Sequence, residues 1–195
     1  MKILFPILFM FFSSPIIADN ISDFQIEGFS VGDSLLDFYN EVQIINNKAN
    51  YFPNEREYYV VHSGDLKLEN FDSIEFYLKT GDSKFIIRYF AAFIFYKDGI
   101  ILSNCENLRK KYSNAVENIL MNPNKVDEGR FSHYYDKSGK SISSRINFLI
   151  GDDYISLECL DWSDDIHKKH PQWTDNLSVI VGTDEIQRWV ESGYK

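Results

Sequence analysis

Two short turns, each set between two apolar segments, constrain the fold of this chain more than any other feature. The turns are Thr80-Gly81-Asp82-Ser83 and Gly151-Asp152-Asp153. The segments that flank them are residues 74–78, 85–96, 144–150 and 154–161. Runs rich in aromatic and β-branched residues on both sides of a Gly-Asp turn are typical of β-hairpins. The sequence therefore predicts an antiparallel sheet rather than parallel strands that alternate with helices.

The remaining periodic segments predict an α+β fold. Apolar residues three and four apart indicate helices at residues 34–45 and 103–121 and after Thr183. Ser103 and Glu106 have the spacing of a capping box at the start of the second helix. Further strands are expected at residues 24–26, 58–62, 131–135 and 177–181, and a charged loop at 162–173. We expect an antiparallel sheet of hairpins with about three helices packed on one face.

The first 18 residues have the pattern of a secretory signal peptide. Lys2 is followed by an apolar run from Ile3 to Phe12, and Ala18 supplies a small residue at the expected cleavage point. The run is shorter than the roughly 20 residues of a membrane-spanning helix, although an uncleaved anchor is the alternative. We expect residues 1–18 to be a signal peptide, residues 19–195 to form a single α+β domain, and the protein to be periplasmic or secreted.

The two cysteines are expected to form a disulfide. Cys105 lies on the apolar side of the expected helix at 103–121, with Leu108, Tyr112, Ala115 and Ile119. Cys159 lies in the segment Ile155, Leu157, Cys159, which alternates as one face of a strand. Both sulfur atoms are then directed toward the core, and a lone cysteine pair in an exported protein most simply forms one bridge.

The acidic character of the chain excludes several partners. The formal net charge is −9, and loss of residues 1–18 removes only Lys2, which makes it −10. Such a chain is repelled by nucleic-acid phosphates and by anionic lipid. We expect no nucleic-acid binding, no stable membrane insertion after signal cleavage, and no cofactor.

One motif suggests a hydrolase. Gly32-Asp33-Ser34-Leu35 near the N-terminus, with Asp164-Asp165-Ile166-His167 near the C-terminus, resembles the motifs of GDSL-type esterases and lipases. The resemblance implies Ser34 as nucleophile, His167 as base and Asp164 as the residue that orients it. The chain lacks an Asn-Asp pair, which that family uses in its oxyanion hole, and its hairpins differ from that family's parallel sheet. The alternative is that Ser34 caps a helix.

Two further groups of residues are candidate binding sites. His167 and His170 are three residues apart with carboxylates nearby, a pattern that can bind Zn²⁺, although a solvated loop has the same composition. The aromatic residues Tyr51, Tyr58, Trp162 and Trp173 are candidates for a recognition face for peptide or sugar.

The opening and the tail of the chain together indicate a class rather than an activity. The opening is Phe24-Gln25-Ile26-Glu27-Gly28-Phe29-Ser30-Val31-Gly32-Asp33-Ser34-Leu35-Leu36, and the tail has Asp161-Trp162-Ser163 and Trp173-Thr174-Asp175-Asn176-Leu177. They resemble a group of small exported bacterial proteins without an assigned activity. We therefore expect a non-catalytic binding or interaction domain with a protein, peptide or sugar partner. The alternatives are a serine esterase using Ser34 and a divalent-metal-binding protein using His167 and His170.

Overall fold

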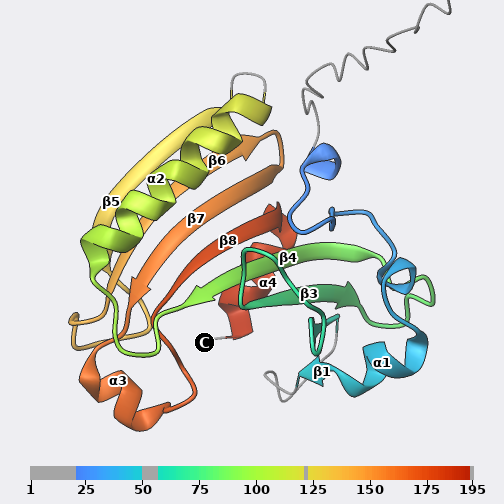
Figure 1. The fold of residues 1–195 in the computed structure, drawn as a ribbon, viewed down its shortest axis with the longest axis horizontal. Helices are drawn as coiled ribbons and strands as arrows, with labels where there is room; N and C mark the ends of the chain where they lie inside the picture. Colours follow the sequence, from blue (N-terminus) through green and yellow to red (C-terminus); the bar gives the residue numbers. More distant parts are fainter. Residues whose placement is uncertain (1–20, 50–56, 121–122, 194–195) are drawn as a thin grey trace, which may run out of the picture.

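One antiparallel sheet organises the molecule. The computed structural model describes residues 21–49, 57–120 and 123–193, so the expected signal peptide and Tyr51 lie outside the described residues. The strands are β1 Lys48–Ala49, β2 Tyr58–His62, β3 Ser73–Lys79, β4 Ile87–Phe95, β5 Asn124–Ser132, β6 Ile142–Ile150, β7 Asp153–Asp161 and β8 Asn176–Thr183. Their order in the eight-stranded sheet is β1-β2-β3-β4-β8-β7-β6-β5. The last strand in sequence, β8, thus lies between β4 and β7 near the middle of the sheet (Figure 1).

Both predicted hairpins are confirmed. β3 pairs with β4 and β6 pairs with β7, and every neighbouring pair in the sheet is antiparallel. At the β6–β7 turn Gly151 has a φ of 63°, a left-handed conformation that glycine adopts without steric cost. The turn residues therefore set the register that pairs Ile150 with Asp153 and Ser144 with Cys159.

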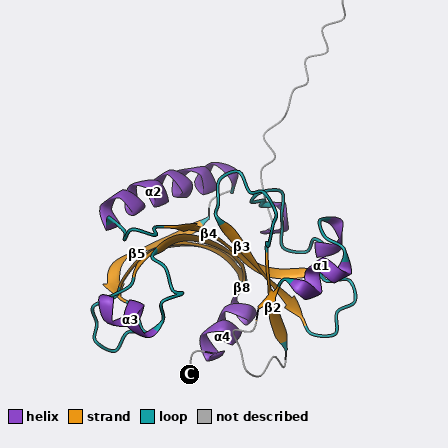
Figure 2. Ribbon diagram, turned by 60° about the horizontal axis from the view of Figure 1, so that its bottom comes forward, coloured by secondary structure: helices purple, strands orange, loops and turns teal. Residues whose placement is uncertain are grey.

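The helices cover the sheet on both faces, so the prediction of helices on one face is wrong. They are α1 Glu41–Asn46, α2 Leu102–Ile119, α3 Asp164–Lys169 and α4 Asp184–Gly193. Figure 2 shows α2 above the convex face of the curved sheet and α3 and α4 below its concave face. Since α1 and α3 have six residues each, the fold is dominated by the sheet. None of the helices in the described part of the chain is long and apolar enough to cross a membrane.

The helix expected at residues 34–45 is replaced by two short pieces. Ser34 caps a 3₁₀ turn, Leu35–Asp37, and Asn40 then starts α1 with its own capping box to Gln43. Because Asn40 binds the backbone N–H of Gln43, the chain enters a new helix there instead of continuing the first. Val42, expected on the buried side, is 66 % exposed.

The expected start of α2 is also wrong. Its N-cap residue is Ile101, without a side-chain cap, and Glu106 binds Arg130 and Ser144 of the sheet instead of closing a capping box. The expected loop at 162–173 contains α3, and the strand expected at 131–135 is displaced to β5 at Asn124–Ser132.

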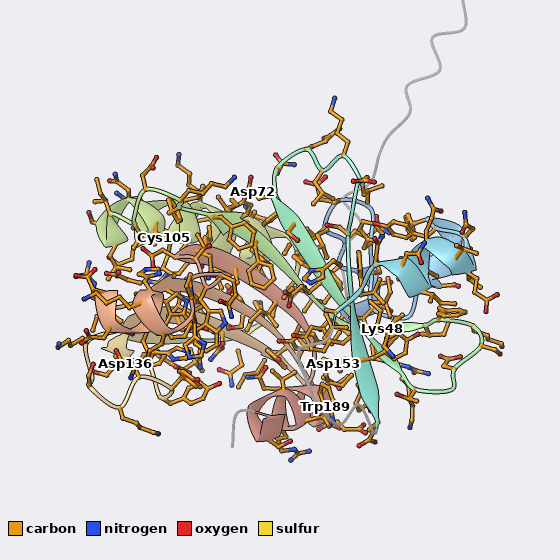
Figure 3. The ribbon with its side chains drawn as sticks, turned by 90° about the horizontal axis from the view of Figure 1, so that it is seen from below. Lys48, Asp72, Cys105, Asp136, Asp153 and Trp189 are labelled. Carbon is orange, nitrogen blue, oxygen red and sulfur yellow. A yellow bond between two sulfur atoms is a disulfide. The ribbon has the colours of Figure 1, made fainter. Side chains whose placement is uncertain are left out.

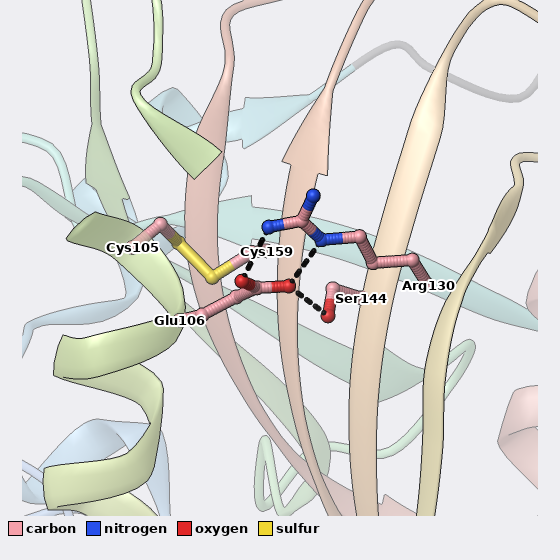
Figure 4. Close-up of a disulfide and its surroundings, with 5 residues drawn as sticks. All are labelled: Cys105, Glu106, Arg130, Ser144 and Cys159. Atoms are coloured by element: carbon pink, nitrogen blue, oxygen red, sulfur yellow. Dashed lines mark hydrogen bonds and ion pairs between the residues drawn. A yellow bond between two sulfur atoms is a disulfide. The ribbon is translucent and has the colours of Figure 1, made fainter. Parts of the chain in front are cut away.

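The predicted disulfide is confirmed. Cys105 in α2 is bonded to Cys159 in β7, with Cα atoms 6.0 Å apart, and both residues are fully buried. Next to it, Glu106 of α2 binds Arg130 of β5 and Ser144 of β6 (Figure 4). The covalent bond and the ion pair together fix the start of α2 on the convex face.

The two faces of the sheet differ in character. The convex face carries the main apolar cluster, which includes Phe76, Phe90, Phe148 and Leu157 and is completed by α2 and the segment before α1. The concave face carries a smaller cluster in which α4 packs Ile186 and Trp189 against tyrosines of β2, β3, β4 and β7. The rest of the concave face is more polar and more open.

Candidate ligand-binding site

The segment between β7 and β8 brings two tryptophans together at one end of the concave face. Trp162 follows the last residue of β7, α3 occupies Asp164–Lys169, and Trp173 precedes β8. The two indole rings lie 4.9 Å apart between centroids, and both remain partly exposed. The pair Trp162 and Trp173, predicted as part of a binding face, is thus brought into contact by one helical turn.

Neighbouring aromatic side chains hold both rings in place. His170 stacks on Trp173 at 4.2 Å with an interplanar angle of 14°, and Tyr135 meets Trp173 edge-on at 4.8 Å. His133 meets Trp162 at 4.6 Å, and the Tyr135 hydroxyl lies 3.2 Å from His170 Nε2. Aromatic pairs at these separations and angles are stabilising beyond the area they bury.

A pocket of about 460 Å³ opens beside the tryptophans. Its lining includes Trp162 and Trp173, four residues after β4, and four ionisable residues between the end of β7 and the start of β8: Tyr96, Lys97, Gly99 and Ile100, and Asp161, Asp164, His167 and Asp175. We call it the α3 pocket. Three carboxylates face one lysine, Lys97, and one histidine in its lining, so it favours ligands that donate hydrogen bonds or carry positive charge.

Asp175 organises the floor of the α3 pocket. It is 3 % exposed and accepts hydrogen bonds from the backbone N–H groups of Trp162 at 2.8 Å and Ile100 at 3.1 Å. Burial raises the pKa of the neighbouring Asp161, the charge of Asp175 raises it further, and His167 lowers it. A hydrogen-bond donor in the pocket would favour the charged form of Asp161 and so lower this raised pKa.

His167 is fixed by two acceptors. Its Nδ1 lies 3.1 Å from the carbonyl oxygen of Trp173, and its Nε2 lies 3.1 Å from Oδ1 of Asp175. A carbonyl and a carboxylate only accept hydrogen bonds, so each of these oxygens bonds a ring nitrogen that carries a proton. Both ring nitrogens thus face acceptors of the protein rather than a nucleophile.

Ser34 lies far from this pocket. Its hydroxyl donates to the carbonyl of Lys84 at 2.7 Å and accepts from the N–H of Leu36, and its backbone bridges to Ile86 beside the start of β4. The β8 end next to Trp173 pairs with Phe95, at the other end of β4. At about 3.3 Å per residue the two places are some 25–30 Å apart along the strand. The structure does not bring Ser34 together with Asp164 and His167, as a triad requires.

The two histidines are likewise separate. His167 is directed at Asp175, whereas His170 stacks on Trp173 and contacts Tyr135. Within the described ranges, no group of three or more His, Cys, Asp or Glu side chains is arranged to hold a metal ion.

Tyr58 is not part of the α3 pocket. It is buried in β2, meets Trp189 of α4 edge-on, and donates its hydroxyl to Glu185 at 2.9 Å. β3, β4 and β8 separate its strand from β7, so Tyr58 and the tryptophan pair belong to different sites.

Sequence analysis missed a second hollow on the concave face. This concave basin, of about 310 Å³, is lined by Arg145 and Asn147 of β6, Ser156 and Glu158 of β7, and residues near the β6–β7 turn including Asp153. Arg145 binds Glu158 with Nε and Nη2 at 3.1–3.2 Å, and its Nη1 lies 3.6 Å from Glu128. Figure 3 shows Asp153 near Trp189 of α4, away from Asp136 at the α3 end. No sequence signal identifies this basin, because its residues meet only through strand register.

Comparisons with known proteins give no further guide to the site. No protein-family model matches the chain, and no curated protein and no solved structure matches it significantly. The geometry of the α3 pocket is therefore the basis for a functional proposal.

Proposed function

We propose that this is an exported, non-catalytic binding protein that takes a carbohydrate in the α3 pocket. The observation that carries the proposal is the contact between Trp162 and Trp173 at the mouth of a pocket that also contains Asp161 and Asp164. Partly exposed indole rings offer flat apolar surface, and a few fixed polar groups beside them give orientation.

The chemistry of the pocket favours a sugar. The carbon-bound hydrogens on one side of a pyranose ring form an apolar face that can stack on an indole, while its hydroxyls donate to carboxylates. Asp161 and Asp164 supply acceptors on the pocket lining next to Trp162. A hydrogen bond to a charged carboxylate contributes about 1.5–3 kcal/mol, which suits a neutral polyol with many donors.

Hydrogen bonds next to the pocket tie the start of α3 to the loop after β5, which also favours binding. Asp136 accepts hydrogen bonds from the backbone N–H groups of Ser138 and Ser141 and from the hydroxyls of Ser141 and Ser163. Hydrogen bonds from Ser138, Ser141 and Ser163 keep the pKa of Asp136 well below its usual range. The loop after β5 and the start of α3 are joined in this way, so little conformational entropy is lost when a ligand settles against Trp162.

The positions of Ser34 and His167 support a non-catalytic role. Ser34 is at the opposite end of β4 from the pocket, and both ring nitrogens of His167 are held by acceptors. A hydrolase built on Ser34 and His167 would need the two side chains within hydrogen-bond reach.

Export is the second part of the proposal. The Cys105–Cys159 bond suits an oxidising compartment, and residues 1–18 have the pattern of a signal peptide. Expression in a bacterial host followed by intact-mass analysis of the periplasmic fraction tests this part. A chain beginning after Ala18 supports export, and an uncleaved chain retained in the cytoplasm contradicts it.

Tryptophan fluorescence tests the binding proposal, because the chain has only three tryptophans. Screening a panel of oligosaccharides should identify one that shifts the emission of the wild type. Trp173→Phe should abolish most of the shift and weaken binding by about tenfold or more. The matched control Trp189→Phe removes an indole from α4 and should leave the dissociation constant unchanged. A panel of peptides serves as the competing class: if peptides bind and sugars do not, the carbohydrate proposal is wrong.

A further inference from the structure

A charged residue lies on the buried side of α2. The helix buries Cys105, Arg109, Ser113 and Val116, which are spaced three and four residues apart and so share one face. Arg109 is only 7 % exposed, although its side chain ends in a guanidinium group with five N–H donors. The expected apolar face with Ala115 and Ile119 is rotated, since both of those residues are exposed.

Two of the three guanidinium nitrogens of Arg109 have no hydrogen-bond partner among the described residues. Its Nε and Nη1 atoms are buried without a hydrogen-bond acceptor. One turn further along the same face, the Ser113 hydroxyl is fully buried and also has no partner. A guanidinium has donors only, and a serine hydroxyl has one donor and can also accept, so the side chains offer several donors that no protein acceptor meets.

The carboxylate of Glu106, whose pKa Arg109 influences, already has hydrogen-bond partners. Glu106 accepts from Arg130 at 2.8 Å and 2.7 Å and from the Ser144 hydroxyl at 2.8 Å, so both carboxylate oxygens are engaged (Figure 4). Arg130 is the main cause that lowers the pKa of Glu106 to about 2, and Arg109 contributes least to this shift. The single negative charge of Glu106 thus interacts with two guanidinium groups, and the ion pair with Arg130 already neutralises it.

We propose that a small inorganic anion such as chloride binds at Arg109, on the side of α2 that faces the sheet. An uncompensated charge taken out of water is strongly unfavourable, whereas a paired one is tolerated. An anion supplies both the missing negative charge and the acceptor for the guanidinium N–H groups. The site is independent of the α3 pocket and would couple the stability of the α2 layer to anion concentration.

Unfolding measured in sodium chloride and in sodium gluconate at equal ionic strength tests this site. Chloride at about ten times its dissociation constant should raise the folding equilibrium constant of the wild type about tenfold relative to gluconate. Arg109→Met should lose this difference. The matched control Lys110→Met removes an exposed charge from the neighbouring position of α2 and should keep the wild-type response.

Two results would overturn the proposal. The first is a wild type that unfolds identically in the two salts. The second is an Arg109→Met variant that keeps the full chloride response, which would show that the anion acts elsewhere. If Arg109→Met does not fold, Arg109→Gln replaces it, and the wild-type comparison of the two salts still decides the first result.

Discussion

The convex and concave faces of the sheet carry different kinds of side chain on the same strands. Along β7, Ile155 and Leu157 face the convex layer and are fully buried, while Ser156 and Glu158, which alternate with them, belong to the concave basin. The convex layer is covered by α2 and is cross-linked to it by a disulfide. On the concave face, the helices in the described part of the chain are α3 and α4 (Figure 2).

This difference separates stability from binding. Apolar burial is concentrated where a long helix can cover it, so the convex layer supplies most of the folding free energy. Small and polar side chains on the concave face leave one hollow beside α3 and another beside α4. Substitutions on the convex face should therefore mainly reduce stability, and substitutions on the concave face should mainly reduce binding.

The largest expected effect is loss of the cross-link on the convex side. The bond joins residues 54 apart, and a loop of this length corresponds to about 4 kcal/mol in the chain-entropy description of the unfolded state. Replacing both Cys105 and Cys159 by Ser should lower the free energy of unfolding by about that amount in urea titrations. A reduced wild type should behave like the double variant, and an unchanged urea midpoint would show that α2 is held without the bond.

Adjacent residues of β7 give the most direct contrast of the two faces. Leu157→Ala creates a cavity in the convex cluster and should cost about 3 kcal/mol. Ser156→Ala on the concave side should change stability by less than about 1 kcal/mol. Chemical denaturation of both variants checks the contrast, and equal losses would mean that the faces share the stability evenly.

Acid titration tests the ion pair that holds α2. The folded pKa of Glu106 is lowered to about 2 from 4.5, so its contribution is present above pH 4.5 and is lost as pH falls toward 2. Because the side chain is partly exposed and solvent screens it, Glu106→Gln should cost only about 1–2 kcal/mol at neutral pH. The difference from wild type should vanish at the acid end. Glu117→Gln, which removes the surface pair with Lys125, is the control and should cost less than about 1 kcal/mol.

The smallest stability effect is expected inside the α3 pocket. Burial raises the pKa of Asp161, so the fold disfavours its charged form and loses stability as pH rises through that pKa. Asp161→Asn should raise the unfolding midpoint slightly at neutral pH while weakening sugar binding about tenfold, because a charged acceptor is lost. Calorimetry of unfolding and of binding measures both. A variant that is less stable but binds the sugar with unchanged affinity would show that Asp161 contributes to folding and not to binding.

The two hairpins were the predictable part of the fold because the signals that identify them are local in the sequence. Alternating apolar residues beside Gly81 and Gly151 identify the hairpins without knowledge of the rest of the chain. The helix predictions are wrong where a side chain binds a residue far away in the sequence instead of one nearby. Glu106 binds Arg130 instead of the backbone at the start of α2. Arg109 lies on the buried face of α2, although the spacing of apolar residues predicted a different buried face.

The candidate site was predictable only in part for the same reason. Trp162 and Trp173 are close in sequence, and a single short helix brings them together. Tyr58 carries a similar aromatic signal, yet strand order places it against α4. Arg145 and Glu158 meet as register partners on neighbouring strands, a pairing that composition and spacing do not reveal.

The position of β8 has a consequence for how the chain acquires its structure. The first four strands form one half of the sheet and β5 to β7 form the other, and only β8 hydrogen-bonds to both. Until residue 183 has been synthesised, each half has an unpaired edge, at β4 and at β7. A chain arranged in this way completes its sheet only after almost all of it has emerged from the ribosome. The two halves of the sheet therefore cannot join while the chain still lacks its last strand.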